Sequence, residues 1–184
     1  MAQSAILLAE SALVGALVLL LWWLRRYIGL APLFVWIGAL QWLQVMMAAS
    51  VYVEPIQGLM VSPGSVVLFP ATIFAALLIY VEGDATETRR LGYGVVITNI
   101  ALFAESLLAR QHLAFPGHLN LLDVHPDLFA QSGRVVVAGT VALFLDLVGV
   151  VVVFDFMSRW LTRSLFIRAW SSLMVIMVFD TVVF

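Results

Sequence analysis

Runs of apolar residues, broken by short polar segments, occupy most of the 184-residue chain. A helix that crosses a bilayer needs about 20 mostly apolar residues, and charge, proline or glycine separates these runs from one another. The pattern predicts an all-α bundle of six transmembrane helices in a single domain over residues 1–184, with residues 109–133 as an extended loop. The predicted spans are 5–24, 30–53, 66–81, 91–108, 135–154 and 169–184.

The last run is the shortest, and it reaches Phe184 without a polar flank. Transmembrane helices rarely end inside their own hydrophobic stretch, because polar residues usually mark the membrane interface. We therefore expect the gene product to continue beyond Phe184 and this bundle to be one module of it.

Composition excludes an ordinary water-soluble domain. Hydrophobic residues make up 64% of the chain and charged residues 11%, whereas charged residues make up about 25% of a typical soluble domain. Cysteine is absent and every cation is arginine, which excludes disulfides, thiolate catalysis and lysine Schiff bases. The net charge of −2 gives no indication of a nucleic-acid partner.

Arginine placement predicts how the bundle lies in the membrane. Arginine is enriched on the cytoplasmic side, so the amino terminus and the loop 109–133 are predicted to lie outside a cell membrane, of prokaryotic type. Trp22 and Trp23 precede the first arginine pair, which is typical of a retained helix rather than a cleaved signal peptide. The arginines in the first, third and fifth turns are Arg25, Arg26, Arg89, Arg90, Arg159, Arg163 and Arg168.

The loop 109–133 is rich in histidine and aspartate, which raises a metal site as one interpretation. The spacings match neither a helical i,i+4 pair nor an established zinc signature. A solvated external loop is the simpler interpretation, so we predict no metal and no other cofactor. Histidine titrates near neutrality, but nothing in the sequence selects pH sensing. The residues concerned are His112, His118, His125, Asp123 and Asp127.

Polar residues inside the apolar runs are the main functional candidates, because a polar group in hydrocarbon is costly and tends to face the bundle interior. Gln41 and Gln44 are three residues apart and share a helical face; Thr98 and Glu105, seven apart, do likewise. Such groups could line one polar cavity that binds the donors of a small, flat, nitrogen-rich ligand. The candidates are Asp146, Asp180, Glu105, Gln41, Gln44 and Asn99.

The alternative is that these residues only join the helices through hydrogen bonds, as amide and hydroxyl side chains often do in membranes. For Gln41, Gln44 and Asn99 both interpretations stay open. For Asp146 and Asp180 we favour function, because a buried aspartate needs a cation, a proton or a strong donor, and neither run contains an arginine.

The clearest backbone signal is Ser62-Pro63-Gly64-Ser65, with Pro70 shortly after it. Pro70 predicts a break in the helix inside the membrane. Broken backbone at depth is tolerated where it is packed in protein or lines a cavity. The segment therefore predicts either a kinked helix start or a ligand-facing loop.

Several short blocks occur in a familiar order. Residues 62–70 read SPGSVVLFP, residues 79–83 read IYVEG, Arg134 opens a later run, and Trp170-Ser171-Ser172 precedes Phe179-Asp180-Thr181. Over residues 62–184 this order resembles the vitamin-uptake-like membrane family. That family includes queuosine-precursor transporters and, more distantly, the substrate-binding components of energy-coupling-factor vitamin importers.

The resemblance implies a bundle of six or seven helices with a small-molecule pocket near the membrane midplane. Ala75 and Ala76 stand where the transporters tend to carry an acidic residue, and Asp146 lies about one turn earlier than in them. The turn 80–90 and the Ser-Pro-Gly-Ser start are more similar to a sensory branch, in which the bundle is the input module of a histidine kinase or cyclic-dinucleotide enzyme. The family's pocket positions correspond here to Ser171, Ser172, Asp180 and Thr181.

The first functional hypothesis is a membrane-embedded input domain of a signal-transduction protein, which binds a small vitamin-like or nucleobase-like molecule. Its partners would be the lipid bilayer, a second copy in a homodimer, and a cytoplasmic effector beyond Phe184 that requires one further span. The alternatives are an uptake transporter or substrate-capture subunit, and a purely structural protein. An enzyme is not expected, because no pair of nucleophile and base is evident in the sequence.

Overall fold

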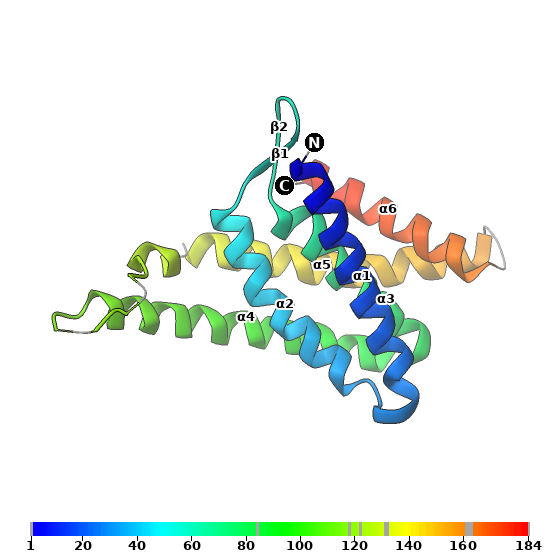
Figure 1. The fold of residues 1–184 in the computed structure, drawn as a ribbon. Coiled ribbons are helices and arrows are strands. Elements are labelled where there is room, and N and C mark those ends of the chain that lie inside the picture. Colours follow the sequence, from blue (N-terminus) through cyan, green and yellow to red (C-terminus); the bar gives the residue numbers. More distant parts are fainter. Residues whose placement is uncertain are drawn as a thin grey trace.

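The computed structural model describes residues 2–83, 85–117, 119–121, 123–130, 133–160 and 164–183. Within them the chain forms six α-helices, two short strands and two turns of other helix types (Figure 1). The predicted all-α membrane bundle is confirmed. The helices are α1 (Ala2–Ile28), α2 (Ala31–Ser50), α3 (Phe69–Glu82), α4 (Ala85–Ala114), α5 (Gly133–Trp160) and α6 (Leu165–Val183).

Five helical segments of the described chain are long and apolar enough to cross a membrane. The helix α6 lies where the sixth apolar run was predicted. The five segments are Gln3–Ile28, Ala31–Ser50, Gly64–Glu82, Thr86–Ala114 and Val136–Trp160.

The loop predicted over residues 109–133 begins later than expected, because α4 continues to Ala114. The residues Arg110, Gln111 and His112 are all compatible with a helix, so α4 continues past its apolar stretch without a break. The helix ends shortly before Gly117, whose φ of +89° suits glycine. Farther along, η2 (Pro126–Phe129) forms a 3-10 turn that packs against α4.

The second predicted run also ends earlier than expected. The helix α2 stops at Ser50, and the chain continues as an antiparallel hairpin of β1 (Val53–Ile56) and β2 (Leu59–Val61). β-Branched and aromatic residues after Ser50 favour extended backbone over a helix. Gly58, with a φ of +82°, supplies the turn.

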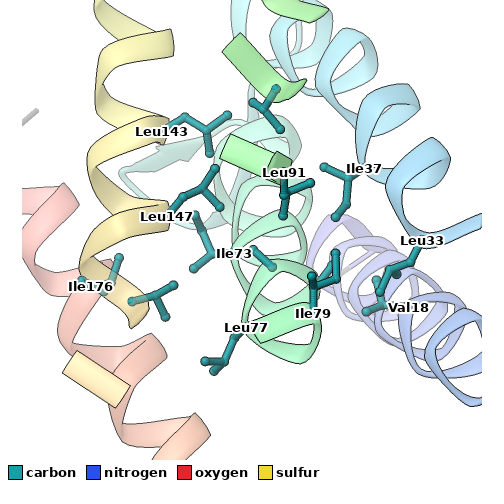
Figure 2. Packing of buried hydrophobic residues seen from close by; sticks show 14 of the residues in the cluster. Val18, Leu33, Ile37, Ile73, Leu77, Ile79, Leu91, Leu143, Leu147 and Ile176 are labelled. Carbon is teal, nitrogen blue, oxygen red and sulfur yellow. The ribbon is translucent and has the colours of Figure 1, made fainter. Parts of the chain in front are cut away.

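The helix α3 forms the centre of the bundle and packs against each of the other five α-helices. Its residues Ile73, Leu77 and Ile79 have no exposed surface, and Figure 2 shows them facing side chains from neighbouring helices, including Leu143 and Leu147 of α5. Ala75 and Ala76 are buried in the same core.

The segment after the hairpin continues into α3 as a helix. Residues Gly64–Leu68 form the π-helical turn η1, in which the Phe69 N–H donates to the Gly64 carbonyl five residues earlier. Pro70 lacks an N–H, and its ring would clash with a carbonyl in regular α-helical register; a wider π turn accommodates it. The structure thus adopts the kinked-helix alternative rather than the ligand-facing loop.

Gly64 lies directly against the backbone of α2. A Cβ at this position would lie 2.5 Å from the Gln44 carbonyl oxygen and 2.6 Å from the Ala48 nitrogen. The Ser62 hydroxyl donates to the Met47 carbonyl at 2.9 Å. This segment therefore fixes the start of α3 on the part of α2 that carries Gln44.

Contacts between helix ends define two sides of the bundle. On one side, Arg25 Nη2 of α1 contacts Glu82 Oε2 of α3 at 2.6 Å. On the other, the Glu54 N–H of β1 donates to Gln3 Oε1 of α1 at 2.9 Å, and Figure 1 shows the hairpin beside the start of α1. These contacts fit helices that cross a membrane in alternating directions. Which side faces the cytoplasm stays a prediction from the arginines.

Candidate ligand-binding cavity

A cavity of about 430 Å³ lies between α2, α4 and α5. Small-molecule sites typically have volumes of about 300–1,000 Å³. Its polar lining comes from Gln41 and Gln44 of α2, Asn99 and Ser106 of α4, and Thr140 of α5. The structure therefore brings together three of the residues that the sequence singled out, namely Gln41, Gln44 and Asn99.

Within the described part of the chain, three buried amide oxygens of the cavity lining have no hydrogen-bond donor: Gln41 Oε1, Gln44 Oε1 and Asn99 Oδ1. A buried acceptor without a donor costs about 1–3 kcal/mol, and such acceptors are rare in native proteins. The three acceptors belong to two helices that line the same cavity, so one bound molecule with several N–H or O–H groups can satisfy them together.

In two of these side chains the amide nitrogen donates to a threonine hydroxyl, and this bond fixes the orientation of the amide group. Asn99 Nδ2 donates to Thr140 Oγ1 at 3.2 Å, and Gln41 Nε2 lies 3.5 Å from Thr72 Oγ1. The Thr72 hydroxyl uses its own hydrogen on the Leu68 carbonyl, so its oxygen accepts the Gln41 amide. In both residues the carbonyl oxygen is the group left without a partner.

The remaining lining is apolar and aromatic. Trp42, Tyr52 and Phe103 contribute ring surface, on which a flat ligand can stack. No charged side chain is found in the lining within the described chain. A charged ligand would be costly to bury without a counter-charge, so the cavity favours a neutral molecule with hydrogen-bond donors.

Asp146 and Asp180 lie together, but outside this cavity. Asp146 of α5 is 2% exposed, and its carboxyl group lies close enough to that of Asp180 of α6 to interact with it. Among the described residues, Asp146 Oδ2 has no hydrogen-bond partner. The structure therefore does not bring these predicted site residues into one cavity: the amides line the cavity between α2, α4 and α5, and the aspartates meet at the α5–α6 interface.

The other predicted site residues also lie apart from the cavity. Glu105 is exposed on α4. The face of α4 that lines the cavity carries Asn99 and, seven residues later, Ser106, so Glu105 lies one residue away from that face. In α6 the hydroxyls of three residues donate to carbonyls of their own helix: Ser171 to Ile167 at 2.6 Å, Ser172 to Arg168 at 2.7 Å and Thr181 to Met177 at 2.7 Å.

Sequence reasoning missed Ser106, Thr140 and the aromatic lining. Ser106 was within reach, since its spacing of seven from Asn99 marks a shared helical face. Thr140 gave no sequence signal, because its role depends on which residue of α4 it meets.

The histidine-rich loop forms local contacts. His125 Nδ1 accepts the Asp127 N–H at 3.3 Å, and Arg110 Nη2 lies 3.9 Å from Asp127 Oδ1. His118 lies outside the described residues. Across the described chain, no group of three His, Cys, Asp or Glu residues is placed to hold a metal ion.

The fold and the cavity define a class of protein: a polytopic membrane bundle with an amide-lined cavity between its helices. The chain belongs to the vitamin uptake-like sensor family, whose sequence model matches residues 15–184. The resemblance seen over residues 62–184 is thereby confirmed, and the match extends over the second half of α1 and all of α2. No curated protein and no solved structure matches the chain.

Proposed function

We propose that this domain is the ligand-sensing input module of a signal-transduction protein and that it binds a small vitamin-like molecule in the cavity between α2, α4 and α5. The observation that carries the proposal is the set of three unpaired amide oxygens at Gln41, Gln44 and Asn99. Membership in a family of vitamin uptake-like sensors supports it.

The lining indicates the chemistry of the ligand. Acceptors without donors match N–H and O–H groups, the rings of Trp42, Tyr52 and Phe103 match a flat body, and the uncharged lining matches a neutral molecule. Neutral heterocyclic vitamins and nucleobases combine these properties. The cavity volume suits a molecule of that size.

Binding would act on the packing of the helices. A ligand that bonds to Gln44 of α2 and Asn99 of α4 favours the arrangement in which both helices reach it, and it shifts the population toward that arrangement. On the opposite side of the bundle, the Tyr80 hydroxyl of α3 donates to Asp155 Oδ1 of α5 at 2.6 Å. A change in helix packing would be passed through such contacts to a cytoplasmic effector.

Ligand-induced thermal stabilisation of the purified chain tests the proposal. The panel would contain riboflavin and neutral deazaguanine bases as candidates, and thiamine and biotin as charged compounds that the cavity should not bind. Each is measured with the wild type, Gln44→Leu and Gln57→Leu. Gln57 lies exposed in the hairpin turn, so it is a matched control for the loss of an amide. Stabilisation that Gln44→Leu abolishes and Gln57→Leu retains is the expected result.

A second measurement separates sensing from uptake. The full gene product is expressed in cells, and its signalling output and the accumulation of the labelled compound are both followed. Output that depends on the compound, without accumulation, supports a sensor. Accumulation that Gln44→Leu abolishes, with no change in output, would favour an uptake transporter instead.

A further inference from the structure

A second hollow, of about 210 Å³, lies on the seam between α4 and α5. The two helices run antiparallel (Figure 1). Asn99 is bonded to Thr140 at one position along their interface, and Tyr93 is stacked on Phe144 nearer the start of α4. The amide-lined cavity occupies the part of the seam at Asn99. The second hollow lies beyond the Tyr93 and Phe144 rings, toward the start of α4 and the end of α5.

This hollow is an apolar groove open to the lipid side. Leu147 is buried at 2% exposure, whereas Val148 and Val152 are 48% and 60% exposed. Gly92 forms part of the lining, where a Cβ would already lie 3.4 Å from the Phe144 ring. Gly92 has no side chain, and the valines are spaced along α5. Together they leave a groove along the α4–α5 interface that suits a hydrocarbon chain.

Arg89 lines the same groove and is exposed. Two carboxylates near this end of the bundle are already paired: Glu87 with Arg90 and Glu82 with Arg25, each at 2.6 Å. No acidic partner is found for Arg89 among the residues that the structure describes. Within the described chain its guanidinium is therefore a positive charge without a paired carboxylate, beside an apolar groove.

We propose that the α4–α5 groove binds one anionic phospholipid, with an acyl chain along Val148 and Val152 and the phosphate on Arg89. Arginine is suited to phosphate because its planar guanidinium donates two parallel hydrogen bonds. The arginine distribution predicts that this end of the bundle faces the cytoplasm, where basic sites between transmembrane helices bind anionic headgroups. This site is separate from the amide-lined cavity and does not depend on the ligand proposed there.

Native mass spectrometry of the purified chain in detergent tests the lipid site. Phosphatidylglycerol and phosphatidylcholine with identical acyl chains are titrated against the wild type, Arg89→Gln and Arg26→Gln. Arg26 is exposed on the same side of the bundle but does not line the groove, so it controls for a general loss of positive charge. We expect Arg89→Gln to lower the preference for phosphatidylglycerol about fivefold, and Arg26→Gln to retain it.

A second variant tests the groove itself. Val148→Trp adds bulk at a half-exposed position, so it fills the channel while leaving the core of the bundle unchanged; it should reduce the binding of both lipids. The proposal is overturned if Arg89→Gln keeps the wild-type preference or if both arginine variants lose it equally. It is also overturned if inorganic phosphate displaces phosphatidylglycerol, because that would identify a site for a free anion.

Discussion

Asn99 of α4 donates from its amide nitrogen to the Thr140 hydroxyl of α5 at 3.2 Å, and within the described chain Asn99 Oδ1 stays buried without a donor. The same pair thus joins two helices and presents an acceptor to the cavity. A buried acceptor without a donor is rare, and this one is consistent with the ligand contact that we propose.

The first prediction concerns ligand affinity at Asn99. Replacement by leucine removes the acceptor, so a ligand donor that was paired becomes buried and unpaired, which costs about 1–3 kcal/mol of binding free energy. Isothermal titration of the ligand identified in the panel measures this loss. Thr140→Val is the companion variant, because it removes the interhelical bond and leaves the acceptor; it should lower thermal stability more than affinity. Equal affinity of wild type and Asn99→Leu would contradict a ligand contact at this residue.

The second prediction concerns the close approach of Gly64 to α2. Gly64→Ala places a methyl group 2.5 Å from the Gln44 carbonyl oxygen, so the start of α3 must move away from α2. Overpacking of this kind costs about 1–3 kcal/mol of stability. Since Gln44 lies at this contact and also lines the cavity, ligand affinity should fall together with stability.

Gly94→Ala is the matched control for that variant. Gly94 lies within α4 with no atom near the position of an added Cβ, and alanine is favoured over glycine inside a helix by about 0.5–1 kcal/mol. Thermal unfolding in detergent should therefore show a lower melting temperature for Gly64→Ala and an equal or higher one for Gly94→Ala. A Gly64→Ala protein as stable as the wild type would refute the packing argument.

The third prediction separates the two contributions of Arg25. Its guanidinium lies 3.8 Å above the Trp22 ring and bonds to the Trp22 carbonyl at 2.8 Å, in addition to the ion pair with Glu82. Glu82 is 41% exposed, so Glu82→Gln should cost only about 0.2–1 kcal/mol, and less at high salt. Arg25→Lys retains the charge but loses the planar stacking, and it should destabilise the protein more. The reverse order of melting temperatures would show that the ion pair is the dominant contact.

Much of the fold could be predicted from the sequence because lipid imposes a simple requirement. Backbone groups in hydrocarbon must bond within their own segment, so long apolar runs give helices, as α1, α4 and α5 do. The ends were harder to predict. Polar residues such as Gln111 occur both in loops and in solvated helix ends, so hydropathy does not show where α4 stops. The hairpin after Ser50 depends on local strand preference, which hydropathy does not measure.

The site was predicted only in part because its grouping depends on helix rotation. Gln41, Gln44 and Asn99 were identified as costly groups in hydrocarbon, and they do share one cavity. Glu105 was equally conspicuous, yet it is exposed while the adjacent Ser106 lines the cavity. A rotation of one residue, about 100°, is set by packing against α2 and α5, and periodicity along one helix does not reveal it.

The last prediction concerns the aspartate pair between α5 and α6. The carboxyl groups of Asp146 and Asp180 interact with each other at the α5–α6 interface, so either single leucine variant leaves one carboxyl group without its partner, at a cost of about 1–3 kcal/mol. The double variant Asp146→Leu/Asp180→Leu removes both groups and should be more stable than either single one, because replacing both partners is nearly neutral. Asp146→Asn keeps a donor for Asp180 and should unfold near the wild-type temperature. Ligand affinity should be unchanged throughout, since neither aspartate lines the cavity. Loss of affinity in a stable double variant would instead place the aspartates in the binding site.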